Sequence, residues 1–174
     1  MRFEFSGAPE ITAPKPVVWS HLMNPEFIAR SAPGVESVEP VDPTHFKVVS
    51  GLGIGSVKVG FKLDVELFDI VDQESLGMRA LGKGPGSIVD VVSRVRLEPG
   101  GDGRTRLHWS ATSDVSGVVA GIGARLIEGT ARRLTEEFWA DFARRVSGRE
   151  PETDPHFRPA SLTDGGASRR RRPP

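Results

Sequence analysis

The segment that most constrains the fold of this chain is its last regular one, residues 119–146. Apolar side chains recur there at steps of three and four residues, with charged side chains between them, which is typical of an amphipathic α-helix. The members of this stripe are Val119, Ile122, Leu126, Leu134, Phe138, Phe142 and Val146. Such a helix would be about 40 Å long. It needs a second layer on which to bury its apolar stripe.

Glycines interrupt this segment only in its first half, at Gly121, Gly123 and Gly129. Each costs about 1 kcal/mol relative to alanine inside a helix. Two interpretations remain open. Either the glycines allow close packing against a sheet, or they leave space beside the helix.

The residues before the helix are predicted to form strands. In residues 57–67, six apolar residues alternate with polar residues or glycine, as in a strand with one buried face. Residues 89–97 and 107–115 alternate in the same way. Shorter strands are expected at residues 3–11, 35–41, 46–52 and 76–81. Turns rich in glycine and proline separate these segments, which predicts an antiparallel meander.

Residues 13–30 are predicted to form two short helices. The break lies at Asn24-Pro25, because asparagine caps a helix and proline suits its first turn. The predicted fold is α+β: a curved antiparallel sheet of about seven strands wraps around a long C-terminal helix, and two short helices follow strand 1. We expect residues 1–146 to form one domain with this helix-grip arrangement, typical of START-like proteins.

Composition excludes several classes of function. Lys+Arg and Asp+Glu both total 23, so no excess of positive charge indicates a nucleic acid partner. The chain has no cysteine, which excludes disulfides, thiol catalysis and thiolate metal sites. The first residues alternate like a strand and do not resemble a signal peptide, and no stretch approaches the roughly 20 apolar residues of a membrane span. We therefore expect a cytoplasmic protein.

Residues 147–174 differ in character and are expected to be disordered, because proline, glycine, serine and charged residues dominate them. They end in a run of arginines that could contact an anionic membrane surface, at about 1 kcal/mol each. This predicted membrane contact consists of Arg169, Arg170, Arg171 and Arg172. The alternative is a tail that only aids solubility.

Four motifs give the chain a specific resemblance. They are VWSHL at 18–22 followed by NPE at 24–26, PGVESV at 33–38, GKGPGS at 82–87, and DVSG at 114–117 leading into GARLI at 123–127. With these motifs the chain resembles the CoxG family, named for the CoxG subunit of carbon monoxide dehydrogenase, within the START-like (SRPBCC) superfamily. The resemblance covers most of residues 1–146 and leaves out the tail.

This resemblance implies an accessory role beside a molybdenum hydroxylase of the carbon monoxide dehydrogenase type. Such accessory proteins are associated with bringing the enzyme to the cytoplasmic membrane, and the superfamily shares an apolar cavity between the sheet and the last helix. We expect a quinone or other prenylated lipid in the cavity, no covalent cofactor, and a peripheral location at the inner face of the cell membrane.

Strand alternation and helical phase indicate which side chains point inward. The expected ligand-binding residues are Leu22, Phe27, Phe46, Phe61, Leu63, Leu67, Met78, Val91, Leu107, Trp109, Ile122, Leu126 and Ile127, with Phe5 and Val48 in the same phase. For each of them, an ordinary place in the core is the alternative. Ser93 and Ser113 share the inward phase, so either could hydrogen-bond a ligand carbonyl or the backbone.

Two other classes of function stay open. The first is an adaptor that recruits the dehydrogenase and binds no small molecule. The second, less favoured, is an enzyme like the polyketide cyclases and aromatases of the superfamily. The chain has no tyrosine, and no aspartate or glutamate stands at a telling spacing from its four histidines, His21, His45, His108 and His156. No group of His, Asp and Glu has metal-ligand spacing, so no metal is expected.

Overall fold

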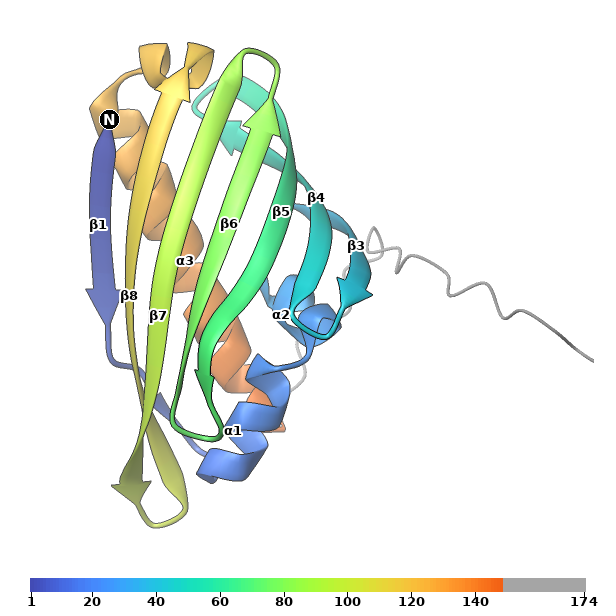
Figure 1. Ribbon diagram of the computed structural model, residues 1–174. Coiled ribbons are helices and arrows are strands. Elements are labelled where there is room, and N and C mark those ends of the chain that lie inside the picture. The colour runs from blue at the N-terminus through green and yellow to red at the C-terminus, as the bar shows by residue number, and fades with distance from the viewer. Residues whose placement is uncertain (149–174) are drawn as a thin grey trace, which may run out of the picture.

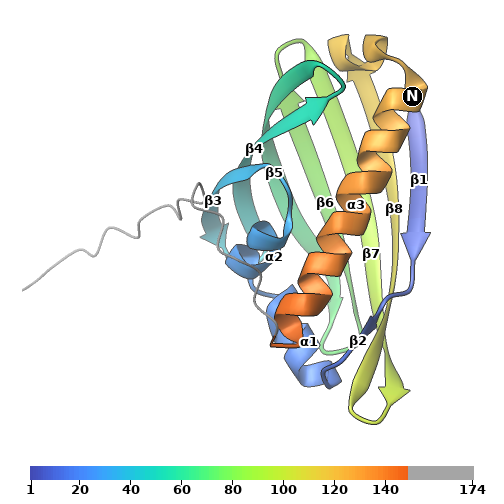
Figure 2. The same cartoon turned by 180° about the vertical axis from the view of Figure 1, so that it is seen from behind.

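The computed structural model describes residues 1–148. It has two layers, a curved antiparallel sheet and a long helix, α3, that crosses one face of the sheet (Figure 1, Figure 2). The strands are β1 Arg2–Gly7, β2 Glu10–Ile11, β3 Val35–Asp42, β4 His45–Ile54, β5 Val57–Val71, β6 Ser75–Gly84, β7 Ser87–Gly101 and β8 Arg104–Gly117. The helices are α1 Lys15–Leu22, α2 Pro25–Ser31, a 3₁₀ helix η1 Val118–Ile122, and α3 Ala124–Val146. The predicted helix-grip fold is confirmed.

Strands β3 to β8 form the predicted meander, and β1 adds to the free edge of β8. The first predicted strand, residues 3–11, is divided in two: β1 and β2 both pair with β8 but are separated by Ala8 and Pro9. Proline has no N–H to donate to a strand ladder, which explains the interruption. The described sheet therefore has eight strands instead of about seven, and the two short helices follow β2.

The long helix begins later than its apolar periodicity predicts, at Ala124 and not at residue 119. Gly123 has φ +116°, a conformation that side-chain-bearing residues rarely adopt, so the chain cannot continue there as an α-helix. On the other side of η1, Gly117 has φ +83°, and a Cβ at this position would collide with the carbonyl oxygen of Gly86. These two glycines bound η1 and separate it from α3.

Two apolar cores lie at opposite ends of the molecule. The core at the α1 and α2 end surrounds the fully buried Phe142 and includes Ile11, Val18, Leu97 and Leu107. The core at the η1 end contains Phe3, Ile54, Phe61, Val115, Val119 and Ile127. The two ends of α3 are thus each packed on the sheet by a separate cluster.

Phe27 holds the three helices together at the first of these ends. Its ring stacks on His21 at 4.1 Å between centroids, and the guanidinium of Arg145 lies 4.1 Å from the same ring. Arg145 also donates hydrogen bonds to the carbonyl oxygen of Phe27 and to Ser31 Oγ, both at 3.0 Å. The predicted cap of α2 is present, because Asn24 Oδ1 accepts from the backbone N–H groups of Glu26 and Phe27.

No helix within residues 1–148 is long and apolar enough to cross a membrane. The predicted disordered tail, apart from Ser147 and Gly148, lies outside the described residues, and so do the four arginines at 169–172. The division of the chain at residue 146 stays a prediction.

Candidate ligand-binding site

Small side chains occupy the centre of the sheet face that α3 crosses. Strand register places Ala111, Ser93 and Met78 in one row across β8, β7 and β6, and Ser113, Val91 and Ala80 in the next row. Four of these six side chains are alanine or serine. They fill less space between sheet and helix than the larger residues of the two cores on either side.

The apolar residues around this centre are only partly buried although they lie on the inner face. On the sheet these residues are Phe5, Leu63, Met78, Val91 and Trp109, and on the middle of α3 they are Leu134, Phe138 and Trp139. Trp109 and Trp139 stack across the two layers with ring centroids 5.9 Å apart. Met78, Val91, Trp109 and Trp139 pack against the first core, Phe5 against the second and Leu63 against both, yet all keep accessible apolar surface. Such surface is the chemistry of a site for a hydrophobic ligand.

Two hydroxyls on the inner face have no protein partner within residues 1–148. Ser93 and Ser113 are half-buried and make no side-chain hydrogen bond there. No buried side-chain nitrogen or oxygen of the described residues lacks a partner, so both hydroxyls keep contact with solvent. Each can donate one hydrogen bond to a bound acceptor.

The structure divides the predicted ligand-binding residues into three groups: those that are buried, those that keep accessible surface, and Leu126, which is described below. Those that are buried in the cores are Leu22, Phe46, Phe61, Leu67, Leu107 and Ile127. Those that keep accessible surface are Phe27, Leu63, Met78, Val91, Trp109 and Ile122. Among these, Phe27 belongs to the junction of the three helices, so the centre of the inner face brings together Leu63, Met78, Val91 and Trp109.

Leu126, the remaining residue, is not on the inner face as its helical phase predicts. It is 50% exposed, and the nearest atom to a Cβ built on Gly55, at the β4–β5 turn, is Leu126 Cδ1 at 3.7 Å. The predicted inward phase was wrong because the stripe was stepped back from Phe142 by four residues at a time. Each such step drifts by about 40° in a helix of 3.6 residues per turn, so Leu126 lies about 160° away from Phe142. Ile127, which was also predicted to point inward, is buried.

Trp139 was missed by the sequence analysis. It contacts the rings of Trp109, Phe138 and Phe142 and is the largest side chain on the inner side of α3. The signal was present, because Trp139 follows Thr135 by four residues and precedes Phe142 by three. The apolar stripe was stepped by four residues through Leu134, Phe138 and Phe142, which placed Trp139 beside the stripe instead of within it.

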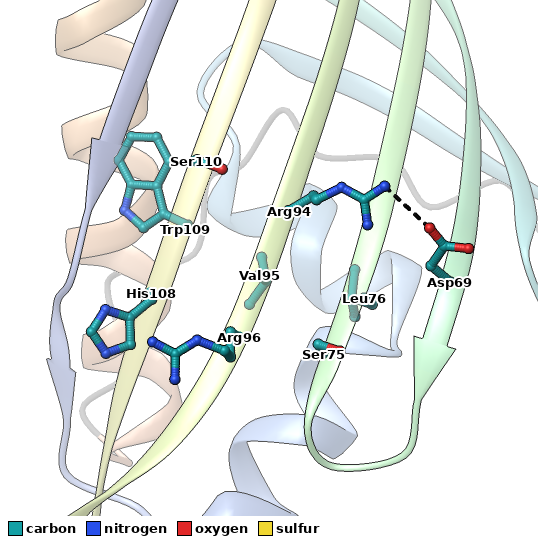
Figure 3. A pocket seen from close by; sticks show the side chains of 9 residues that line it. All are labelled: Asp69, Ser75, Leu76, Arg94, Val95, Arg96, His108, Trp109 and Ser110. Atoms are coloured by element: carbon teal, nitrogen blue, oxygen red, sulfur yellow. Dashed lines mark hydrogen bonds and ion pairs between the residues drawn. The ribbon is translucent and has the colours of Figure 1, made fainter.

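Two hollows lie on the opposite, outer face of the sheet. The first, of about 350 Å³, is bordered by Arg94, Asp69, Arg96 and His108 (Figure 3). Arg94 pairs with Asp69 at 3.1 Å and lies over the ring of Phe68. The second, of about 440 Å³, is bordered by Asp42, His45, Glu66 and Arg79. Most of the charges that border these hollows are ion-paired, Arg96 and His108 with Glu98 and Arg79 with Asp90, which does not favour a charged ligand.

Two histidines do pair with carboxylates, contrary to the sequence analysis. His45 Nδ1 lies 2.9 Å from Asp42 Oδ1, and His108 Nε2 lies 2.6 Å from Glu98 Oε2. The backbone N–H of Thr44, together with His45, lowers the pKa of Asp42 to about 2, and the hydrogen bond to Asp42 raises the pKa of His45. Hydrogen bonds from Arg96 and His108 lower the pKa of Glu98.

Both histidine pairs lie on the outer face of the sheet, away from the apolar surface under α3. In each pair the histidine and the carboxylate stabilise each other's charge, and neither group reaches the inner face to act there as an acid or base. Within residues 1–148, no three His, Asp or Glu side chains gather closely enough to hold a metal ion.

Comparison with protein families decides the relationship. The family described as the CoxG subunit of carbon monoxide dehydrogenase matches residues 7–147. The chain belongs to the CoxG family. The match ends one residue past α3, so it covers the helices, nearly the whole sheet and the surface described above. No curated protein matches the chain.

Solved structures agree on the fold of this CoxG family member. A conserved protein from Geobacillus kaustophilus superposes with a TM-score of 0.77 at 26% identity, covering 84% of this chain and 96% of that one. A START superfamily protein from Mycobacterium smegmatis gives 0.63 at 14% identity, covering 83% and 97%. The ZhuI aromatase/cyclase from Streptomyces sp. R1128 gives 0.60 at 15% identity, covering 84% and 96%. At these last two identities the likeness shows the fold alone.

Proposed function

We propose that this CoxG family member is a non-catalytic accessory protein of a carbon monoxide dehydrogenase-type molybdenum hydroxylase. It holds a hydrophobic ligand, a respiratory quinone or another prenylated lipid, between the sheet and α3, and it links the enzyme to the inner face of the cell membrane. The partner enzyme follows from the family. The ligand rests on one observation of this chain, the accessible apolar surface between its two cores.

The chemistry of that surface suits a prenylated quinone. A five-carbon isoprenoid unit moved from water into contact with Leu63, Val91 and Trp109 contributes about 3–4 kcal/mol before ordering costs. The hydroxyls of Ser93 and Ser113 can donate to a quinone carbonyl, which a purely apolar site could not do. The site thus offers burial for the tail and a polar contact for the head group.

A substitution at Ser113 tests the proposal. Ser113→Leu adds a branched side chain to the inner face and removes a hydroxyl, while Ser110→Leu places the same side chain on the exposed outer face of the same strand. We expect Ser113→Leu to weaken binding of a short-chain menaquinone about tenfold, since it displaces two or three carbons of the ligand. Ser110→Leu should bind like the wild type.

Binding can be followed through tryptophan fluorescence, because quinones quench tryptophan and Trp109 and Trp139 border the site. Thermal unfolding checks that both variants fold. Equal, saturable binding by both variants would place the ligand elsewhere. No saturable quenching in the wild type would favour the adaptor that binds no small molecule.

A further inference from the structure

Exposed apolar side chains gather at the end of the molecule where η1 meets two hairpin turns. Val57, Ile88, Val118 and Leu126 are 44%, 46%, 72% and 50% exposed. We call these four residues, with the basic residues named below, the hairpin rim. Figure 1 shows the β4–β5 turn, the β6–β7 turn and η1 together at this end, opposite α1.

Contacts join the rim across the segment between β8 and α3. The backbone N–H of Val118 donates to the carbonyl oxygen of Gly86 in the β6–β7 turn at 2.8 Å, and Leu126 approaches Gly55 in the β4–β5 turn. These contacts tie η1 to the β6–β7 turn and α3 to the β4–β5 turn. Large apolar side chains left in water at hairpin tips cost solvation free energy without adding to the core, which indicates an interaction surface.

Positive charge predominates at this end. The three segments that build it, residues 51–62, 82–89 and 115–127, contain Lys58, Lys62, Lys83 and Arg125 and no acidic residue. None of these four cations makes an ion pair within residues 1–148. Acidic residues adjoin these segments: Asp64, Asp90, Asp114 and Glu128 lie just beyond them in the sequence, and Glu36 of β3 lies beside Gly51. Asp90, Asp114 and Glu128 are paired with Arg79, Arg2 and Arg132.

Two of these cations lie close enough to repel each other. Lys62 and Lys83 lie directly opposite each other on β5 and β6, and Ile88 continues the same row on β7. Like charges directly opposite in a sheet destabilise it. No ion pair within residues 1–148 relieves this repulsion, and an anionic surface that contacts the rim would neutralise both lysines at once.

We propose that the hairpin rim is the surface with which the protein contacts an anionic lipid bilayer. Val57, Ile88, Val118 and Leu126 enter the interfacial layer, and the four cations bind lipid head groups. This inference rests on the proposed function for its purpose, since the core beneath the rim borders the ligand site. It differs from the predicted contact of Arg169–Arg172, because it places the membrane at the η1 end of the described domain.

The opposite end of the sheet supplies a natural control. Ile70 and Val71, near the β5–β6 turn, are also exposed, but Asp69, Asp72 and Glu74 surround them in the sequence. Asp69 pairs with Arg94 and Glu74 with Lys15, whereas Asp72 has no ion pair within residues 1–148. Residues 69–75 contain no cation that could bind anionic lipid. Exposure alone would make both ends bind, whereas the charge argument selects only the hairpin rim.

Flotation of the full chain with quinone-free vesicles tests the proposal. We expect binding to vesicles of phosphatidylcholine and phosphatidylglycerol, but not of phosphatidylcholine alone, and loss of binding in about 0.5 M salt. Lys62→Gln with Lys83→Gln should weaken binding about fivefold per lysine, whereas Lys47→Gln on the same face should not. Val118→Ser should weaken it and Val71→Ser should not.

A background variant with all four terminal arginines, Arg169–Arg172, replaced by glutamine distinguishes their contribution to vesicle binding from that of the rim. Rim substitutions that weaken vesicle binding in both backgrounds support the proposal. Rim variants that bind vesicles like the wild type overturn it, and so do rim variants that lose only their binding to the dehydrogenase. Because the vesicles carry no quinone, failure here is distinct from failure of the carrier.

A second readout does not depend on affinity. The chain has no cysteine, so Val118→Cys and Val71→Cys can each be labelled with a polarity-sensitive dye. We expect a blue shift on anionic vesicles from position 118 only. A shift at position 71, or at neither, would contradict the assigned surface.

Discussion

His45 shows how single residues on the outer face set the response of this protein to pH. Its ring lies between Asp42 and Glu66, and the hydrogen bond to Asp42 raises the pKa of His45 above its usual value. A raised histidine pKa means that folding favours the protonated ring. The stabilisation is complete below the pKa of the unfolded chain and is lost as the pH rises through the folded value.

We therefore expect His45→Gln to lower the free energy of unfolding at about pH 5.5, with the difference from the wild type vanishing by about pH 8.5. Asp42 acts at the other extreme, because its pKa of about 2 gives stability that is lost as the pH falls from about 4 toward 2. Urea denaturation at several pH values measures both. A difference that stays constant from acidic to basic pH would show that the His45 charge has no part in it.

Individual residues of the site were only partly predictable. Strand alternation correctly placed Val91 and Trp109 on the inner face, because a period of two leaves no ambiguity once the strand is recognised. It could not distinguish buried Phe61 from accessible Leu63, two residues apart on β5. The difference in burial between these two residues depends on which side chains of the helical layer lie opposite each of them. The alternation along one strand carries no information about that.

Among the elements, the last helical segment shows most clearly that glycines in one segment serve different purposes. Its three glycines have different roles, and a Cβ at any of them would have no neighbour within 4 Å. Close packing against the sheet therefore does not explain them. Gly123 is required by its positive φ, whereas Gly129 lies within α3 with one side open to solvent.

Alanine substitution separates these two roles. Gly129→Ala should raise the free energy of unfolding by about 0.5–1 kcal/mol, because glycine is a poor helix former. Gly123→Ala should lower it by about 1–3 kcal/mol, because alanine must adopt φ +116° or shift the junction with η1. Chemical denaturation measures both. Equal effects of the same sign would mean that Gly123 is not a conformational break.

The order of the elements was predictable, but the split of the first strand, the separate η1 and the ends of the elements were not. The alternation in residues 57–67 identified β5, yet the strand runs to Val71 through a bulge at Asp69, whose φ is positive. Polar residues at the outer ends of long strands resemble loops in sequence. Pairing with β6, and not local preference, extends the strand there.

At the scale of the whole molecule, two separate cores explain how a small domain can be stable and still keep accessible apolar surface at its centre. The C-terminal end of α3 packs with α1 and α2, and its first turns pack against the η1 end of the sheet. Between them, Trp109 of β8 stacks on Trp139 of α3, and small residues of β7 and β8 lie on the same face of the sheet as Trp109. This arrangement depends on contacts between residues far apart in sequence. The sequence alone therefore predicted the fold but not the accessible surface within it.

The most direct test of this account is organic extraction of the purified full chain followed by mass spectrometry, together with uptake from quinone-loaded vesicles. The account predicts a prenylated quinone or related lipid from the wild type, and much less from Ser113→Leu than from Ser110→Leu. Absence of any isoprenoid from the wild type, with no uptake from the vesicles, would contradict the proposed carrier.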